Sequence, residues 1–301
     1  MEEKIYDLII IGAGPAGLTA ALYSGRYLLS TLVIGELQGG EISEASEVCN
    51  FPTYSSITGM QLSLKMLEQV KNLGIEIKQE KVKEIKKNKN FEITTNNFTY
   101  KSKKIILATG TEKTKLGLKK EEEFLGKGIS YCATCDAGFY KDKKVAIVGG
   151  SNAALTAALL LSKYAIKVYI IYRRDKFFRA EPAWVKQVEK NKKIFSVFNS
   201  NIKEINGLEK VGGITLDNNK KILLDGIFIE IGSSPNIKLA EQLNLSLEKD
   251  YIATDKFQKT SLSGVFAAGD ITNNPLKQAI TACGEGAIAA NSVYEEIKKE
   301  E

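Results

Sequence analysis

The chain has 301 residues, 44% of them apolar, which is enough to fill the core of one large domain or of two ordinary ones. Its 42 Lys+Arg against 36 Asp+Glu give a formal charge of +6 that is scattered along the chain, so we expect no nucleic-acid partner. The absence of histidine excludes Ser-His-Asp and Cys-His catalysis and any zinc site that uses histidine.

The first residues are acidic, and the first apolar run, residues 8–11, stops at Gly12. This is not the pattern of a signal peptide or a membrane span, so we expect no membrane partner and a location in the cytoplasm. In a reducing cytoplasm, a Cys-x-x-Cys pair is more often redox-active or metal-binding than a structural crosslink.

A strand, a tight turn and a helix are predicted near the start of the chain. Residues 6–11 form a short apolar run that leads into Gly12-Ala-Gly14-Pro-Ala-Gly17, and the following LTAALYSGR has helical spacing. Glycine in such a turn lets the backbone approach a pyrophosphate closely, and the helix N-terminus offers free N–H groups. The sequence therefore predicts a dinucleotide-binding fold.

A thiol pair follows in the middle of the chain, in the segment Tyr131-Cys132-Ala-Thr-Cys135-Asp136. Two cysteines at this spacing can close a small disulfide ring, so we favour a redox dithiol with Asp136 as the nearest candidate acid. The alternative is half of a zinc ribbon. A second Cys-x-x-Cys is missing, because Cys49 and Cys283 are solitary and are expected to be packed thiols, so no metal site is predicted.

The nucleotide-binding pattern occurs a second time. Residues 144–164 repeat residues 7–27 at a constant offset of 137, and both segments contain LTAAL. The second turn reads Gly149-Gly150-Ser151-Asn152-Ala153-Ala154. The repeat predicts a second dinucleotide-binding unit, in which Ser151 replaces the middle glycine and places a side chain near the pyrophosphate path.

The charge at the end of the second strand differs between the two repeats, because Glu36 falls on Arg173 at the same offset. A carboxylate accepts hydrogen bonds from the ribose hydroxyls of FAD or NAD, whereas guanidinium groups suit a 2′-phosphate. Arg173, Arg174 and Arg179 therefore indicate NADPH in the second unit. The alternative is an ordinary exposed basic turn.

In chain order, the sequence contains GAGPAGL, QGGEI, NFP, ILATG, YCATCD, the second glycine turn, RRDKFFRA and VFAAGDI…KQA. Over nearly the whole chain this set resembles the bacterial and archaeal thioredoxin reductases of the low-mass type. The resemblance implies an α/β fold of two Rossmann-like, three-layer domains, the second inserted in the first. Residues 1–112 with 234–301 would bind FAD, and residues 113–233 would bind NADPH and carry the CATC motif. It also implies a homodimer and a partner that is thioredoxin or a similar small dithiol protein.

The resemblance further implies roles for single residues. Cys135 would face the flavin, Cys132 would attack the partner's disulfide, and Asp136 would supply the proton. The residues expected to contact FAD are Gly12, Gly14, Pro15, Ala16, Gly17, Glu36, Gly40, Glu41, Asn50, Thr109, Gly110, Gly269, Asp270, Lys277, Gln278 and Ala279. Those expected to contact NADPH are Gly149, Gly150, Ser151, Asn152, Ala153, Ala154, Arg173, Arg174 and Arg179.

The chain departs from the family pattern at several of these positions. Glu41 stands where the family usually has glutamine, Cys49 where it has glutamate, and Lys277 where arginine is common. In the second unit Ser151 replaces glycine and Tyr172 replaces the usual histidine. These changes lie beside expected flavin contacts and on the electron-donor side, whereas YCATCD is intact.

The sequence predicts a thioredoxin-disulfide reductase, in which electrons pass from NADPH through FAD and the Cys132–Cys135 pair to a protein disulfide. The second unit would turn between a state that presents NADPH to the flavin and one that presents the thiols. Three alternatives stay open: a different donor such as NADH or ferredoxin, a small-molecule dithiol oxidase, and an FAD-binding thiol sensor that is not an enzyme.

Overall fold

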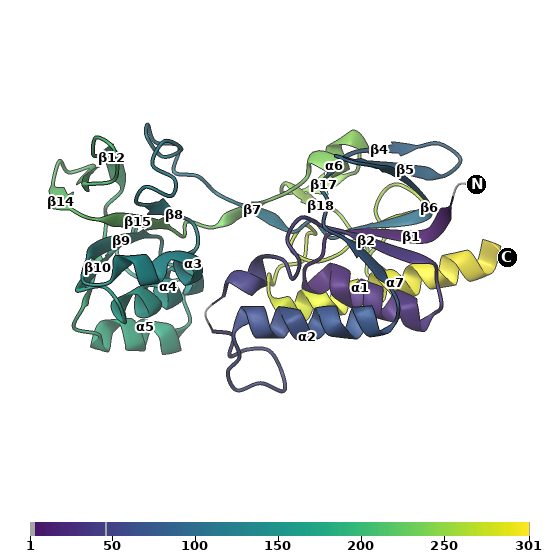
Figure 1. Ribbon diagram of the computed structural model, residues 1–301, viewed down its shortest axis with the longest axis horizontal. Helices are drawn as coiled ribbons and strands as arrows, with labels where there is room; N and C mark the ends of the chain where they lie inside the picture. Colours follow the sequence, from purple (N-terminus) through teal and green to yellow (C-terminus); the bar gives the residue numbers. More distant parts are fainter. Residues whose placement is uncertain (1–3, 46, 301) are drawn as a thin grey trace. The chain divides into compact units, whose positions relative to one another are not determined.

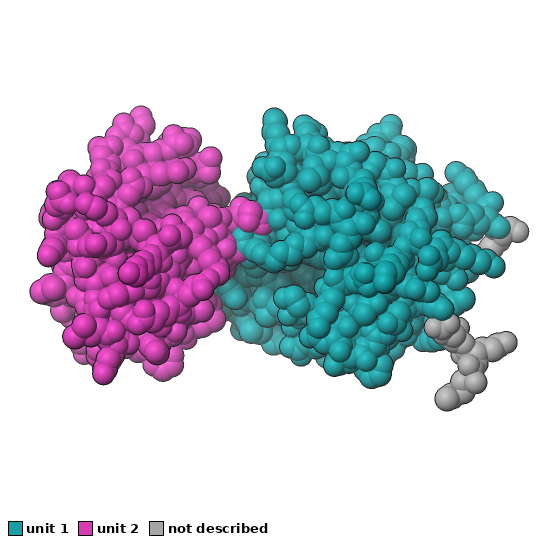
Figure 2. All heavy atoms as spheres, turned by 90° about the horizontal axis from the view of Figure 1, so that it is seen from above, with its two compact units in different colours: residues 1–112, 235–301 teal, residues 113–234 magenta. Residues whose placement is uncertain are grey.

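The computed structural model describes residues 4–45 and 47–300, which fold into two compact units (Figure 2). Unit 1 comprises Met1–Glu112 and Pro235–Glu301, and unit 2 comprises Lys113–Ser234. Unit 2 is therefore an insertion within unit 1. The chain crosses between them in strands β7 (Thr111–Lys113) and β16 (Ser233–Pro235), which pair with each other.

Unit 1 is built around a mixed sheet of order β3-β2-β1-β6-β5-β4, with β19 pairing to β6 (Figure 1). Strands β1, β2, β3, β6 and β19 run parallel, whereas β4, β5 and β6 form antiparallel pairs. Its elements are β1 (Ile5–Ile11), α1 (Pro15–Arg26), β2 (Thr31–Ile34), η1 (Glu41–Glu44), α2 (Gly59–Asn72), β3 (Glu76–Lys78), β4 (Val82–Lys87), β5 (Phe91–Thr95), β6 (Thr99–Leu107), α6 (Lys238–Gln242), β17 (Leu247–Glu248), β18 (Tyr251–Ile252), β19 (Val265–Ala267) and α7 (Ala279–Glu300).

Both faces of the central strands of unit 1 are covered, which explains why residues 8–11 of β1 and 32–34 of β2 are apolar without interruption. In β1, Leu8 and Ile10 pack toward α1, α2 and α7, which lie on one face of the sheet (Figure 1). Ile9 and Ile11 point to the opposite face, where they share a core with residues of α6. The sheet is thus packed between two layers, one of helices α1, α2 and α7 and one that includes α6.

Unit 2 contains a parallel sheet of order β11-β10-β9-β15-β8 and a small antiparallel sheet of order β12-β13-β14. Val145 and Ile147 of β9 face a core shared with α4 and α5, and Ala146 and Val148 face the antiparallel sheet. Its elements are β8 (Ile129–Ser130), α3 (Ala133–Asp136), η2 (Ala137–Tyr140), β9 (Lys144–Val148), α4 (Asn152–Ser162), β10 (Lys167–Ile171), α5 (Pro182–Lys190), β11 (Ile194–Val197), β12 (Ile202–Asn206), β13 (Gly213–Leu216), β14 (Lys221–Leu223) and β15 (Gly226–Ile229).

The internal sequence repeat extends to strand register. Leu8 pairs with Thr31 between β1 and β2, and Val145 pairs with Val168 between β9 and β10. Both members of the second pair lie 137 positions after those of the first. The two units therefore share one strand-turn-helix-strand arrangement, and equivalent residues of the two turns can be compared directly.

Candidate redox site and nucleotide-binding turns

Cys132 and Cys135 form a disulfide, with their Cα atoms 5.3 Å apart. Cys132 is the N-cap of α3 and is half-buried, and Cys135 lies within the helix and is exposed. The backbone N–H of Cys135 donates a hydrogen bond to the Cys132 sulfur over 3.1 Å. The two predicted redox residues are thus paired at the surface of unit 2.

The segment before the disulfide holds Cys132 from its backbone. The N–H of Cys132 donates to the Ser130 hydroxyl oxygen (3.0 Å), and that hydroxyl donates to the Cys132 carbonyl (3.2 Å). Ser130 is the last residue of β8, which is anchored by pairing with β15. Cys132 therefore lies two residues beyond the carboxyl end of a strand of the parallel sheet. Sequence reasoning did not identify Ser130.

Asp136, the predicted acid, ends α3 directly after Cys135 and is half-buried. Its backbone N–H donates to the carbonyl of Cys132 (3.2 Å). Burial, followed by the charges of Asp136 and Asp225, raises the pKa of the Tyr140 phenol, so this hydroxyl stays protonated at neutral pH. Asp136 lies in the same helical turn, α3, as the disulfide between Cys132 and Cys135.

The first glycine turn of unit 1 has the shape that a pyrophosphate requires. A Cβ at Gly12, where φ is +121°, would lie 2.0 Å from the carbonyl oxygen of Ala108. Gly14 caps α1 without a side-chain hydrogen bond, Pro15 has no N–H to offer, and the first turn carries no acidic side chain. The backbone donors at this helix N-terminus are therefore left for an anion, which fits the phosphates of FAD.

The other residues expected around FAD in unit 1 follow the carboxyl ends of its parallel strands. Glu36 follows β2, Thr109 and Gly110 follow β6, and Gly269 and Asp270 follow β19. Parallel strands end at one edge of the sheet, so these residues gather there.

Two further glycines, Gly40 and Gly269, lie close to residues of the first turn. A Cβ at Gly40 would lie 2.7 Å from the Gly14 Cα, and a Cβ at Gly269 would lie 2.9 Å from the Ala16 Cβ. The structure therefore brings the expected FAD-contacting segments of unit 1 together around α1, with Gly17 in its first turn.

Glu36, expected at the adenosine ribose, is exposed and lies 3.0 Å from the Lys81 ammonium group. An exposed ion pair of this kind contributes little to stability, and a ribose hydroxyl can compete with it. The carboxylate is therefore available for the predicted contact.

The polar residues expected near the flavin are linked to one another. The Asn50 side-chain amide donates to Oε1 of Gln278 (2.9 Å), although the two residues are far apart in sequence. The Thr109 hydroxyl donates to the carbonyl of Asn236 (3.2 Å), whose N–H donates to the Gly110 carbonyl (3.1 Å). These contacts tie the segments on either side of the inserted unit, and Asn236 was not identified from the sequence.

Glu41 begins η1, and its carboxylate accepts a hydrogen bond from the Thr111 hydroxyl (3.3 Å). Lys277 and Gln278 precede α7, whose first residue is Ala279. The Lys277 ammonium group donates to the carbonyl of Thr272 and lies 4.1 Å from the centre of the Tyr251 ring. The lysine that replaces the usual arginine is thus held against its own loop.

Asp270 and Lys277 both lie in partly buried surroundings that disfavour charge. Burial raises the pKa of Asp270, and the Lys277 charge opposes this rise. Burial lowers the pKa of Lys277, which the charges of Asp270 and Glu285 oppose. Glu285 of α7 is itself only 5% exposed, and sequence reasoning did not identify it.

The second glycine turn, in unit 2, keeps the first glycine of the pattern, whereas Ser151 and Ala154 replace the second and third. A Cβ at Gly149 would lie 2.1 Å from the Glu230 carbonyl oxygen, matching the crowding at Gly12. The Tyr172 ring covers Gly150, because a Cβ there would meet its carbon atoms at 2.5 Å. Ser151 caps α4 without a side-chain hydrogen bond, and Ala153 and Ala154 lie in its first turn. The helix N-terminus is preserved, and an aromatic ring lies beside it.

The side chains that flank the second turn are already engaged with one another. The amide of Asn152 donates to the Glu181 carboxylate (2.8 Å), and the N–H of Glu181 donates back (2.7 Å). The guanidinium of Arg174 lies 4.2 Å from the centre of the Phe178 ring, and that of Arg179 lies 5.7 Å from it. Arg173 is exposed. Two of the three predicted 2′-phosphate arginines thus lie over one aromatic side chain.

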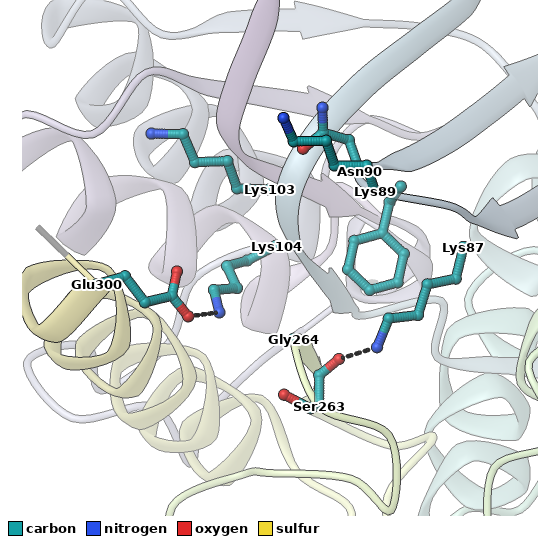
Figure 3. Close-up of a pocket in the computed structure, with 9 residues that line it drawn as sticks. Lys87, Lys89, Asn90, Lys103, Lys104, Ser263, Gly264 and Glu300 are labelled. Carbon is teal, nitrogen blue, oxygen red and sulfur yellow. Dashed lines mark hydrogen bonds and ion pairs between the residues drawn. The ribbon is translucent and has the colours of Figure 1, made fainter.

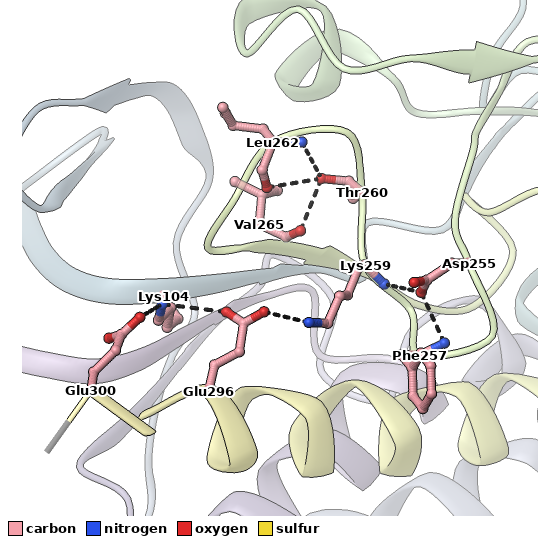
Figure 4. Close-up of polar contacts among 9 residues, drawn as sticks. All are labelled: Lys104, Asp255, Phe257, Lys259, Thr260, Leu262, Val265, Glu296 and Glu300. Carbon is pink, nitrogen blue, oxygen red and sulfur yellow. Dashed lines mark hydrogen bonds and ion pairs between the residues drawn. The ribbon is translucent and has the colours of Figure 1, made fainter. Parts of the chain in front are cut away.

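A hollow of about 260 Å³ in unit 1 is lined by lysines, but it lies at the opposite end of α7 from the expected FAD site (Figure 3). It includes Glu300, and the 22 residues of α7 place Glu300 roughly 30 Å from Ala279. The one buried lysine among its lining residues, Lys104, lies between the carboxylates of Glu296 (3.3 Å) and Glu300 (2.5 Å). Glu296 also forms an ion pair with Lys259 (2.7 Å), which links α7 to the turn of residues 255–259 (Figure 4). We interpret this network as structural.

The two solitary cysteines differ from each other. Cys283 of α7 is half-buried, and burial raises the pKa of its thiol, so it is a packed and unreactive side chain. Cys49 is exposed, so the expectation that it is packed was wrong. It lies in the loop between η1 and α2, on the surface of unit 1.

Among the residues described, no group of three or more metal-ligating side chains is arranged to hold a metal ion. No helix in the described part of the chain is both long enough and apolar enough to span a membrane.

The comparison with known proteins decides the family. Residues 6–286 match the family model described as pyridine nucleotide-disulphide oxidoreductase. The chain belongs to this family. Thioredoxin reductase of Listeria monocytogenes is 43% identical over 99% of this chain and 97% of its own length.

Solved structures agree with this assignment. The crystal structure of Lactococcus lactis thioredoxin reductase matches with a TM-score of 0.94 at 34% identity, covering 98% of this chain and 99% of that chain. Thioredoxin reductase of T. acidophilum matches with a TM-score of 0.92 at 36% identity, over 98% of this chain and 100% of that chain. The predicted α/β fold of two Rossmann-like FAD/NAD(P)-binding domains and the resemblance to low-mass thioredoxin reductases are confirmed.

Proposed function

We propose that the chain is an FAD-dependent thioredoxin-disulfide reductase that uses NADPH as donor and the Cys132–Cys135 pair as its disulfide-reducing group. The observation that carries this proposal is the Cys-x-x-Cys disulfide at the surface of unit 2, in a chain whose fold and sequence are those of this family. The disulfide is also the only such pair in the sequence, so no other thiols compete for the role.

Unit 1 would hold FAD. Gly12 and Gly14 would leave the backbone open to its pyrophosphate, Glu36 would accept hydrogen bonds from the ribose, and Asp270 and Gln278 would contact the remainder of the cofactor. When bound, FAD supplies the transfer of two electrons from a nicotinamide to a disulfide. What supports this assignment is the absence of side-chain caps and acidic residues in the first turn of α1.

Unit 2 would hold NADPH at the helix N-terminus that follows Gly149, with Arg173, Arg174 and Arg179 at the 2′-phosphate. Two of these guanidinium groups, those of Arg174 and Arg179, lie over the Phe178 ring, 4.2 and 5.7 Å from its centre. Ser151 is small, and its hydroxyl can itself donate to a phosphate oxygen.

The contacts of the thiol pair support Cys132 as the attacking group. Once the disulfide is reduced, the N–H of Cys135 that donates to the Cys132 sulfur can stabilise a thiolate there. The thiolate of Cys132 attacks one sulfur of the partner's disulfide and forms a mixed disulfide, and the other partner sulfur leaves as a thiolate. Cys135 then attacks the Cys132 sulfur, which restores the internal disulfide and releases the second partner sulfur.

Protons must enter because the partner leaves with two thiols. Asp136 directly follows Cys135, and its backbone N–H donates a hydrogen bond to the carbonyl of Cys132, so we assign to Asp136 the delivery of a proton to the departing sulfur.

We further propose that the protein is a homodimer and works in the cytoplasm, where a reduced thiol pool requires such an enzyme.

A second candidate keeps this activity but changes the donor to a reduced carrier protein such as ferredoxin. It is favoured by the Tyr172 ring, which covers Gly150 at the place where a nucleotide phosphate would approach. Such a ring narrows the approach to the α4 N-terminus, and it would matter less for a protein donor that does not enter the turn.

Anaerobic reduction of the FAD-loaded protein tests both candidates. NADPH, NADH and reduced ferredoxin are added separately, and the flavin absorbance and the thiols formed on thioredoxin are measured. We expect NADPH to bleach the flavin and to reduce thioredoxin, and Cys135→Ser to abolish the second step. If NADPH at millimolar concentration leaves the flavin oxidised, the NADPH assignment is wrong. Rapid oxygen consumption with a small dithiol would instead indicate an oxidase, and FAD binding without any turnover would indicate a sensor.

A further inference from the structure

A buried carboxylate lies next to the redox segment of unit 2. Glu121 is 3% exposed, and its oxygens accept hydrogen bonds from three successive backbone N–H groups. These donors are Leu116 (2.8 Å), Gly117 (2.7 Å) and Leu118 (3.2 Å). A carboxylate that is satisfied in this way fixes the loop that wraps around it.

The same carboxylate also accepts a hydrogen bond from the hydroxyl of Tyr131, the residue before Cys132. Burial, followed by the contact with Glu121, raises the pKa of the Tyr131 phenol. The phenol therefore remains a donor throughout the pH range in which the pair would work. The carbonyl of Tyr131 in turn accepts from the Lys113 ammonium group.

These contacts hold Cys132 without using its sulfur. The side chain and carbonyl of Tyr131 are both bonded, and the N–H of Cys132 is bonded to Ser130 (3.0 Å). They can therefore persist when the disulfide is reduced. Helix α3, by contrast, has four residues, too few to be stable without support.

We propose that Glu121 and Tyr131 are positioning residues that keep Cys132 beside Cys135 in the dithiol form and thereby set the redox equilibrium of the pair. The inference rests on the proposed disulfide-reducing function of this pair. A disulfide closes more readily when its two thiols are already held together, because less chain entropy is lost. Loosening Tyr131 frees the dithiol more than the covalently closed disulfide, so it shifts the equilibrium toward the dithiol.

The test is an equilibrium titration of the FAD-loaded protein in mixtures of reduced and oxidised dithiothreitol. The Cys132–Cys135 disulfide gains two electrons and two protons, and dithiothreitol loses them as it closes its own disulfide. Samples are quenched with acid and alkylated, and mass spectrometry of the peptide containing residues 132–135 gives the fraction of dithiol. The readout is a redox equilibrium and does not require turnover.

For Tyr131→Phe we expect the equilibrium constant for disulfide formation to fall about threefold to tenfold, the range of one lost hydrogen bond. Glu121→Gln should change it in the same direction. Tyr169→Phe, which removes a tyrosine hydroxyl from β10 of the same unit, should leave it unchanged. Tyr131→Phe is the milder substitution, so it decides the matter if Glu121→Gln does not fold.

Two results would contradict us, and they differ. If the natural chain titrates but Tyr131→Phe titrates within twofold of it, the positioning role is wrong and the redox function stands. If the pair of the natural chain does not exchange with dithiothreitol at all, the proposed function fails and the inference fails with it.

Discussion

The buried carboxylate of Glu285 accepts a hydrogen bond from the backbone N–H of Gly269, with 2.6 Å between oxygen and nitrogen. It also accepts from the hydroxyl of Thr272 (2.9 Å) and from the side-chain amide of Asn274. Helix α7 thereby holds the loop that carries Asp270, which we expect to bind FAD. Glu285 is thus a support of the flavin site that does not itself need to contact the cofactor.

We predict that Glu285→Ala lowers the free energy of unfolding by about 2–4 kcal/mol, because three donors lose a buried acceptor. FAD binding to the apoprotein should weaken as well, which flavin fluorescence titration measures. The matched control is Glu295→Ala on the same helix, because the Glu295 side chain is exposed and its removal should change the free energy of unfolding by less than about 1 kcal/mol. Equal FAD affinities in the two variants would show that the loop is held by other contacts.

Substitution of the first glycine turn should abolish FAD binding. Gly12→Ala places a Cβ 2.0 Å from the Ala108 oxygen, so we expect a loss of about 3 kcal/mol in stability and no flavin in the purified protein. Gly74→Ala is the control, because Gly74 also has positive φ, +73°, but its Cβ would meet no atom within 4 Å. That variant should lose about 1 kcal/mol and keep its flavin. Thermal unfolding and flavin content measure both effects, and a yellow Gly12→Ala protein would contradict the assignment.

The arginines after β10 should distinguish NADPH from NADH. Arg174→Gln removes a guanidinium from the expected 2′-phosphate position, so we predict a rise of about tenfold in the KM for NADPH and little change in the KM for NADH. Lys176→Gln, in the same exposed turn, serves as the control. Should Arg174→Gln weaken both nucleotides equally, Arg174 would not contact the 2′-phosphate.

The stability of the apoprotein should depend on pH through Asp270. Burial raises the folded-state pKa of Asp270 above 3.8, so just above that pH the folded state retains a proton that the unfolded chain has lost. The contribution of Asp270 to the free energy of unfolding therefore falls as pH rises through this window. Asp270→Asn should remove the decline and weaken FAD binding. Urea unfolding at several pH values between 4 and 7 measures it, and an identical pH profile in the variant would show that another group causes the decline.

Much of unit 1 and of the second turn could be predicted because their signals are local. The glycines, the LTAAL repeat and the Cys-x-x-Cys spacing each lie within a few residues, and the offset of 137 even carries over to strand register. The charge difference between Glu36 and Arg173 is also a local signal, because each residue follows an apolar strand that is easily recognised in the sequence.

The supports of the sites could not be predicted, because their partners come from distant segments. The Glu285 carboxylate accepts a hydrogen bond from Gly269, in the loop after β19. The Glu121 carboxylate accepts hydrogen bonds from Gly117 and from the hydroxyl of Tyr131. One signal was present, because Glu285 is the only charged residue between Ala279 and Tyr294, an unusual position within an apolar helix. The contact of Tyr172 with Gly150 has no such signal, since it depends on how β10 lies beside β9.

The most direct test of the central claim is to trap the mixed disulfide with thioredoxin. In the Cys135→Ser variant, the mixed disulfide formed by Cys132 cannot be resolved from within the protein and should accumulate. We predict an adduct that mass spectrometry maps to Cys132, absent from Cys132→Ser. An adduct that forms only in Cys132→Ser, through Cys135, would reverse the assigned roles, and no adduct in either variant would contradict the claim that this pair passes electrons to thioredoxin.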